Sequence, residues 1–153
     1  ETLRIVPIVR GSQVLVSFEL TDAYSTDLRD AIASGLRTTL TYSIELRMMV
    51  PAWVDRTIAT AVVGITDRYD NLTRRHSLSR TVDGRVVEEL VTEDESIAKR
   101  WLMRLDPLPL YAASKLDPNR DYYVRVSARA RPHSSLLGWT NAIIGQANFT
   151  FIP

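Results

Sequence analysis

Hydrophobic and polar residues alternate along two long runs of the chain, at 14–20 and 39–48. Alternation with a period of two is typical of a strand that packs one face on a core and leaves the other in water. Weaker runs of the same kind predict further strands at 3–10, 59–65, 72–82, 85–91, 122–131 and 143–152. The core-facing side chains of the two long runs should be Val14, Val16, Phe18 and Leu20, then Leu40, Tyr42, Ile44, Leu46 and Met48.

Turn signals between these runs indicate that neighbouring strands are antiparallel. Gly11-Ser12 joins the first two strands. Asp83-Gly84 is a strong signal for a type I′ hairpin, because both central residues of that turn need a positive φ. The strand at 85–91 should therefore fold back on the strand before it.

The first of two helices is predicted after the strand at 14–20. Ser25 or Thr26 can cap its first turn with a side-chain oxygen, and Gly35 can adopt the left-handed conformation that ends a helix. Apolar residues repeat at helical spacing between these two signals. They are Tyr24, Leu28, Ala31 and Ile32.

The second helix is predicted between 92 and 105. Thr92 and Glu95 have the spacing of a capping box, and Pro107 and Pro109 prevent the helix from continuing. An apolar stripe at helical spacing should face the core. It consists of Ile97, Ala98, Trp101, Leu102 and Leu105.

These elements predict a mainly β fold, an antiparallel sandwich of seven or eight strands with two short connecting helices. An immunoglobulin-like arrangement is one form that such a sandwich can take. The chain has 153 residues, a length that should bury about 70% of its unfolded surface in one core. No repeat or linker divides it, so residues 1–153 should form a single domain.

The composition excludes several classes of chemistry. The chain has no cysteine and two histidines, which removes disulfides, thiolate metal sites and a cysteine nucleophile. Its 19 basic and 18 acidic residues give a net charge of +1, so nucleic acid is not an expected partner. Motifs for binding phosphate, dinucleotides or calcium are missing from the sequence. We therefore expect no metal, no cofactor and no catalytic activity.

Three arginines form the first candidate binding surface. Arg125, Arg129 and Arg131 fall on one face of the strand predicted at 122–131. Alternate residues on a strand lie about 6.6 Å apart, close enough for guanidinium groups to share an anionic partner. The alternative is a solvated face on which acidic residues of neighbouring strands neutralise the arginines.

Aromatic residues near predicted turns form the second group of candidates. Trp53 precedes the strand at 59–65, and Tyr69-Asp70 precedes a turn whose other side carries His76. An imidazole and a carboxylate within hydrogen-bonding reach can act as an acid–base pair, but Asp70 is better suited to binding its own backbone in the turn. Trp53 and Tyr69 are kept as candidate binding residues.

Two apolar segments are further candidates. The segment at 106–111 is stiffened by two prolines, which lowers the entropic cost of docking a partner, although it can equally cover the end of the sandwich. The segment at 135–139 ends at Trp139. An exposed side chain of that size would mark an interaction site.

Three short motifs recur in the order expected of one bacterial family. They are Trp53-Val54-Asp55, the run from Arg68 to His76, and the run from Tyr122 to Val126 followed by Trp139. In these motifs the chain resembles an uncharacterised family, domain of unknown function 4390. The resemblance covers most of the chain. It implies an exported protein with an N-terminal signal or anchor, and hence a periplasmic or cell-envelope location, and it implies no particular activity.

The expected function is therefore non-catalytic. We expect a binding or assembly module of the bacterial cell envelope that recognises a protein or an anionic partner through its surface. A membrane tether would lie outside this chain, which opens at Glu1 without a methionine, as either a processed mature form or a trimmed chain does. The candidate binding residues are Arg125, Arg129, Arg131, Trp53, Tyr69 and Trp139.

Two other functions stay open at this point. A carrier of a small apolar ligand would need an internal cavity beside Phe18, Tyr42 or Trp101. A hydrolase would place His76 or His133 beside a carboxylate in a cleft. Either arrangement can be recognised in the structure.

Overall fold

The computed structural model of the protein describes residues 2–132 and 143–149. These ranges contain nine strands, two α-helices and one short 3-10 helix. In chain order they are β1 (Thr2–Arg10), β2 (Gln13–Thr21), α1 (Thr26–Ala33), β3 (Thr38–Met48), β4 (Arg56–Asp70), β5 (Arg75–Val82), β6 (Arg85–Thr92), α2 (Glu95–Met103), β7 (Arg104–Ala112), η1 (Ala113–Lys115), β8 (Tyr122–Pro132) and β9 (Ile143–Phe149).

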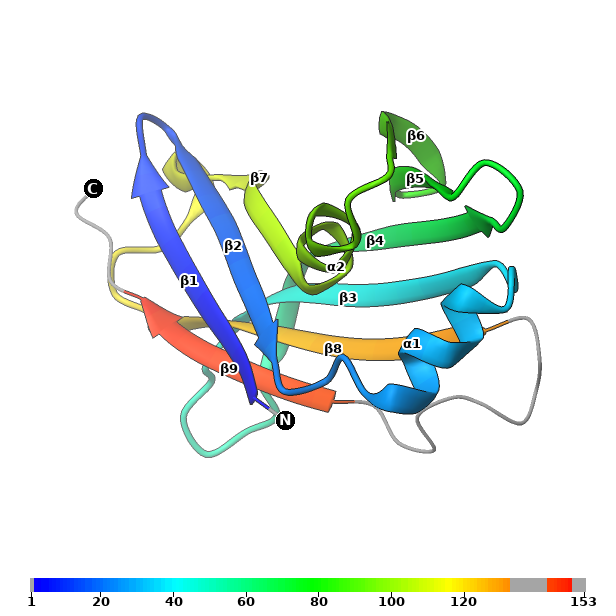
Figure 1. The fold of residues 1–153 in the computed structure, drawn as a ribbon. Helices are drawn as coiled ribbons and strands as arrows, with labels where there is room; N and C mark the ends of the chain where they lie inside the picture. Colours follow the sequence, from blue (N-terminus) through cyan, green and yellow to red (C-terminus); the bar gives the residue numbers. More distant parts are fainter. Residues whose placement is uncertain (1, 133–142, 150–153) are drawn as a thin grey trace.

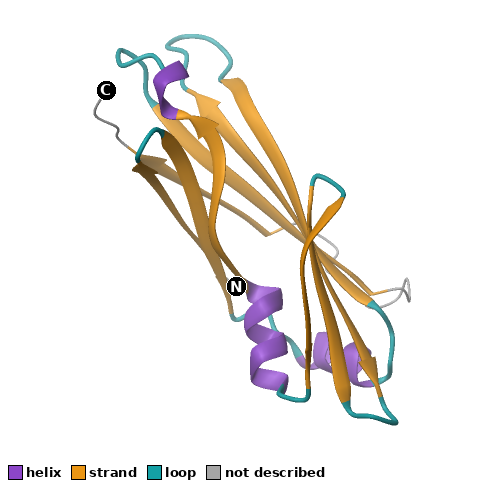
Figure 2. Cartoon of the chain, turned by 90° about the horizontal axis from the view of Figure 1, so that it is seen from above, coloured by secondary structure: helices purple, strands orange, loops and turns teal. Residues whose placement is uncertain are grey.

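The strands form two sheets that face each other (Figure 1). One sheet has the order β1-β2-β7 and the other the order β6-β5-β4-β3-β8-β9, and every neighbouring pair of strands runs antiparallel. Both helices lie toward one end of the molecule (Figure 2), where α2 packs on β4 and β5. The prediction of a mainly β, antiparallel sandwich with two helices is confirmed.

Two details differ from what the sequence predicted. The described residues hold nine strands rather than seven or eight, because the proline-stiffened segment lies within β7. Pro107 and Pro109 are tolerated there because β7 is an edge strand, which needs hydrogen bonds on one side only. The larger sheet also places β3 to β6 as successive neighbours, unlike the immunoglobulin arrangement, whose sheets are ABED and CFG.

The two long alternating runs supply the centre of the core. Their inward-facing residues are buried, except for Met48, which is half-buried. The Tyr42 ring lies 4.5 Å from the Phe18 ring, between their centroids, and its hydroxyl donates to the carbonyl of Leu102 in α2. Side chains from both sheets and from α2 therefore fill this part of the interior.

The two sheets approach each other along one side, where β1 and β9 run side by side (Figure 1). Gly145 of β9 makes this approach feasible. A Cβ on this residue would lie 2.8 Å from the carbonyl oxygen of Leu3 in β1, so a larger residue would push the strands apart. The open edges of the sandwich are consequently β7 and β6.

Most of the predicted turns and caps are also confirmed. Asp83 and Gly84 have φ values of 51° and 83°, as a type I′ hairpin requires. The Oγ of Ser25 accepts a hydrogen bond from the N–H of Leu28 at 3.2 Å and so caps α1, while Gly35, with φ at 86°, follows the helix.

The cap predicted for α2 is wrong by two residues. Asp94 is the N-cap, and its Oδ1 accepts from the N–H of Ser96 at 2.9 Å. Thr92 instead accepts from the N–H of Asp94 at 3.0 Å and shapes the turn before the helix. An aspartate is as good a cap as a threonine, so the capping-box spacing chose the wrong one of two suitable residues.

Candidate functional site

The outer face of the six-stranded sheet carries the predicted arginine stripe. Arg125 of β8 donates from Nε and Nη2 to Oε2 of Glu45 in β3, at 2.9 and 2.7 Å. This pairing is the neutralised face that we considered as the alternative. Arg129 is exposed, and the side chain of Arg131 lies outside the described part of the structure. A binding role for these two residues stays a prediction.

One end of this face holds a polar network around Asp55. The hydroxyl of Tyr123 donates to Oδ2 of Asp55 at 2.6 Å, and the N–H of Val50 donates to Oδ1 at 3.3 Å. Arg47 donates from Nε to the Tyr123 hydroxyl at 3.0 Å and from Nη2 to the Asp55 carbonyl at 3.2 Å. The connection between β3 and β4 is therefore held in place by hydrogen bonds from side chains of both β3 and β8.

The network favours the charged forms of Asp55 and Arg47. The hydrogen bond from Tyr123 lowers the pKa of Asp55 below its usual range, and the Val50 N–H and the nearby Arg47 add to this effect, while partial burial opposes it. The same tyrosine, as hydrogen-bond partner, raises the pKa of Arg47. An ionised Asp55 is thus the form that holds the connection in place.

The connection presents three apolar side chains to solvent, and we call residues 49–55 the Trp53 loop. Trp53 is 80% exposed, Val54 is 74% exposed and Met49 is 45% exposed. The N–H of Trp53 donates to the carbonyl of Val50 at 3.1 Å, and Ala52 between them has φ at 59°. The structure therefore places the predicted binding residue Trp53 at the tip of a fastened loop.

Tyr69, another predicted binding residue, lies at the far end of β4 from the Trp53 loop. Its ring packs on the ring of His76, the residue directly opposite in β5, with 4.6 Å between ring centroids. The fifteen residues of β4 separate the two places by about 45 Å, at the rise of an extended strand. The structure thus does not bring Trp53 and Tyr69 into one site.

His76 does have a carboxylate partner, and it is Asp67 of β4. The Nδ1 of His76 lies 2.9 and 3.1 Å from the two carboxylate oxygens of Asp67. The imidazole side chain is 7% exposed, and the Asp67 side chain is fully buried. Burial raises the pKa of Asp67, and the neighbouring His76 partly offsets this rise.

Asp70 plays the structural role that the sequence favoured for it. Its Oδ1 accepts from the N–H of Leu72 at 2.8 Å and from the N–H of Thr73 at 3.4 Å, which builds the turn between β4 and β5. These backbone donors lower the pKa of Asp70. The acid–base pair therefore uses Asp67, which sequence reasoning did not select.

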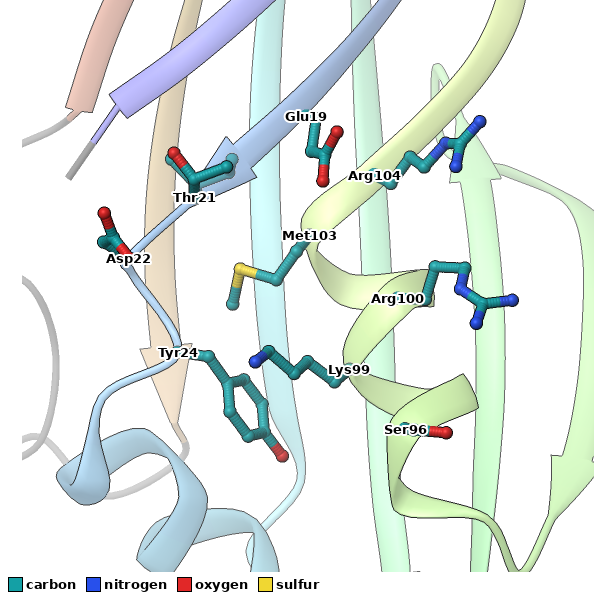
Figure 3. A pocket seen from close by; sticks show the side chains of 10 residues that line it. Glu19, Thr21, Asp22, Tyr24, Ser96, Lys99, Arg100, Met103 and Arg104 are labelled. Carbon is teal, nitrogen blue, oxygen red and sulfur yellow. The ribbon is translucent and has the colours of Figure 1, made fainter.

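Two cavities that share Tyr24 open at the end of the sandwich that carries the helices. The larger, of about 660 Å³, lies between the end of β2 and α2 (Figure 3). The smaller, of about 370 Å³, lies beside His76 and Tyr69. Tyr24 lines both, and burial together with Glu95 and Asp67 raises its pKa to about 12. Lys99 reaches over the Tyr24 ring, 5.4 Å from its centroid.

Several functional residues escaped the sequence reasoning for different reasons. Asp67 continues the inward-facing series Ala61, Val63 and Ile65, so a carboxylate in a core register was a signal that could have been used. Tyr123 reaches Asp55 only because β8 pairs with β3, where it stands opposite Arg47. No local pattern in the sequence contains that pairing.

The remaining predictions concern metal binding, Trp139, His133 and membrane spans. Within the described residues no cluster of three or more histidine, aspartate or glutamate side chains could hold a metal ion. Trp139 and His133 lie outside the described residues. The described helices include none long and apolar enough to cross a membrane.

The fold and its surface features define a single-chain antiparallel β-sandwich with a fastened, tryptophan-bearing loop at one end and a helix-lined cleft at the other. Residues 2–134 match the model of a family described as Domain of unknown function (DUF4390). The chain therefore belongs to this family, as its motifs indicated. No curated protein and no solved structure matches the chain.

Proposed function

We propose that the domain is a non-catalytic binding or assembly module of the bacterial cell envelope, and that it recognises a partner protein through the Trp53 loop. The observation that carries this proposal is the position of Trp53. Its side chain is 80% exposed, although the backbone around it is held by side chains from two strands.

Energetics explain why such a residue suits binding. Tryptophan is enriched among the few interface residues that supply most of the binding free energy, because it buries a large apolar surface and has few side-chain torsions to freeze. A loop that is already ordered loses less conformational entropy when it docks. The hydrogen bonds around Asp55 fix the Trp53 loop before any partner arrives.

The same geometry favours a protein over a simple anion as the partner at this end. Arg125 is engaged by Glu45, and Arg47 is engaged by Tyr123 and the Asp55 carbonyl. The free surface of the Trp53 loop is apolar, with Val54 and Met49 beside the indole. An apolar socket on another protein would bury all three side chains.

The packing of the interior argues against the carrier alternative. Tyr42 is completely buried and packs on Phe18. Trp101 is covered on one side by the guanidinium of Arg80, 4.3 Å from the ring centroid. Side chains thus occupy the places where an enclosed ligand would have to lie.

A hydrolase is the second candidate, because His76 meets the carboxylate of Asp67 beside a cavity. The described residues that line this cavity include no serine, threonine or cysteine, so water would be the nucleophile and His76 its general base. Turnover of model esters that disappears in His76→Asn would favour this candidate over the binding module. Absence of turnover with intact fold would remove it.

The envelope location is supported by family membership alone, since the family resembles exported proteins. Fractionation of the producing bacterium with antibody against the domain tests this part. We expect the protein in the periplasmic or envelope fraction. Recovery with the cytoplasmic enzymes would contradict the proposed location without affecting the proposed binding surface.

Site-specific photo-crosslinking in the producing bacterium tests the binding surface. A photoreactive phenylalanine derivative replaces Trp53 in one strain and Leu72 in a second. Leu72 is a matched control because it is 95% exposed and lies in the turn between β4 and β5, at the other end of β4. We expect one defined crosslinked protein from position 53 and not from position 72. Equal products from both positions, or none, would contradict the proposal.

A further inference from the structure

His76 has one ring nitrogen that the fold does not use. The residue is 5% exposed, and its Nδ1 is occupied by Asp67. Its Nε2 has no hydrogen-bond partner among the described residues. The one described buried side-chain atom that lacks a partner is Nε of Arg80. The Nε2 of His76 is therefore not sealed off from solvent, and His76 lines a cavity of about 370 Å³.

The charged residues around this cavity are paired with one exception. Glu95 forms an ion pair with Arg29, with 2.9 Å between Oε1 and Nε, and Oε1 of Glu93 lies 3.6 Å from Nε of Arg75. Arg74 lines the cavity without a partner within the described residues. An uncommitted guanidinium and an uncommitted imidazole nitrogen thus face the same space.

The remaining walls are apolar or aromatic. Ile32 and Ala33 come from α1, Tyr24 from the segment before α1, and Tyr69 from β4. Ligand sites in proteins commonly combine a mostly apolar cavity of this size with a few convergent polar groups. A volume of about 370 Å³ is enough for a small organic molecule.

We propose that this cavity binds a small organic anion, with its carboxylate or phosphate group between Arg74 and the Nε2–H of His76. A guanidinium donates charge-assisted hydrogen bonds, which are shorter and stronger than neutral ones. In the complex the Nε2–H of His76 donates to the ligand, while Nδ1 stays on Asp67. The contacts with Asp67 hold the ring in one orientation at the wall of the cavity that His76 lines.

The ligand body would lie against Tyr24, Tyr69 and Ile32. This site is about 45 Å from the Trp53 loop along β4, at the rise of an extended strand. The two proposals therefore concern different surfaces, and either can fail without the other.

Titration of the intact domain, followed by NMR of the histidine ring nitrogens, tests the proposal. The probes are inorganic phosphate, acetate and 3-phenylpropionate at constant ionic strength. We expect saturable shifts of the His76 ring with the carboxylates, and tighter binding of phenylpropionate than of acetate. Preferential binding of phosphate would identify a phosphate group as the head of the ligand and would still support the site. No saturable shift with any probe would overturn the proposal.

Two substitutions separate the site from a general charge effect. Arg74→Gln removes one donor and should weaken binding by about tenfold or more, the value of a charge-assisted hydrogen bond. Arg68→Gln removes the same charge from the opposite face of β4, where Arg68 is exposed, and should leave affinity within about twofold. Equal losses in both variants would show binding by net charge alone and would overturn the site. Because Arg74 is exposed, its variant should fold even where a His76 variant does not.

Discussion

Asp55 and Asp67 stand near the two ends of β4 and are held in opposite ways. Asp55 lies at the surface, accepts hydrogen bonds from Tyr123 and Val50, and has a lowered pKa. Asp67 is buried, its carboxylate is held by the side chain of His76, and its pKa is raised. The balance between donors and desolvation decides the direction in each case.

The two regions also differ in the kind of binding for which they are suited. Tyr123, Val50 and Arg47 all donate to Asp55, so this acid orders a loop whose large exposed side chains are apolar. The pair at Asp67 leaves Nε2 of His76 without a hydrogen-bond partner among the described residues, and His76 lines a cavity. The first region is therefore suited to presenting a surface, and the second to receiving a small ligand.

The largest expected effect comes from removing the partner of Asp67. His76→Leu leaves a carboxylate buried without a hydrogen-bond donor, which should lower the free energy of unfolding by about 3–5 kcal/mol. Urea denaturation measures this change. The double variant Asp67→Leu with His76→Leu should recover much of the loss, because no buried charge remains. A single variant as stable as the original would mean that Asp67 is not buried as described.

A smaller loss is expected from the other region. Tyr123→Phe removes the hydroxyl that joins Asp55 to Arg47 and should cost about 1 kcal/mol, the net value of a typical hydrogen bond. The indole signal of Trp53 should also show faster local motion in 15N relaxation. Ser127→Ala, on the same face of β8, is the control and should change neither quantity. Unchanged Trp53 relaxation in Tyr123→Phe would show that the network does not order the loop.

Acid should act on the two aspartates in opposite directions. The stabilising contribution of Asp55 is present above the ordinary carboxyl pKa of 3.8 and is lost as the pH falls through its lowered folded pKa. The contribution of Asp67 is full below 3.8 and is lost as the pH rises through its raised folded pKa. The free energy of unfolding is measured at a series of pH values for the original domain, for Asp55→Asn and for Asp67→Asn. The difference between each variant and the original gives the contribution of that aspartate. Identical pH profiles for both variants would contradict the comparison.

The smallest effect on stability is expected from substitution of Trp53, the proposed binding residue. Trp53→Ala should change the free energy of unfolding by less than about 0.5 kcal/mol, because a side chain that is 80% exposed contributes little to stability. Thermal denaturation provides the measurement. A large loss would place Trp53 in the packing of the domain and remove the reason for calling it a binding residue.

The sequence predicts the fold better than it predicts the sites, for physical reasons. Alternation identifies inward-facing residues such as Tyr42 and Val16 because burial acts on each strand separately. The Asp83-Gly84 turn is also predictable, because its backbone conformation depends on these two adjacent residues. The strand at Arg104–Ala112 was missed because prolines usually argue against a strand, and only its edge position permits them.

The sites depend on which strands become neighbours. Arg125 meets Glu45, and Tyr123 meets Asp55, because β8 pairs with β3. Local sequence patterns do not predict which strands pair. Trp53 was selected as an isolated aromatic, without the loop that makes it notable. Asp67 lay in an inward register between apolar residues and could have been found by continuing the alternation one step further.

The affinity of the partner identified by crosslinking at position 53 tests the central claim most directly. The dissociation constant is measured for the original domain, for Trp53→Ala and for Leu72→Ala, all of which should be equally stable. The proposed hot spot predicts that Trp53→Ala weakens binding by at least about thirtyfold, while Leu72→Ala leaves it unchanged. Equal affinity of the original domain and Trp53→Ala would contradict the account.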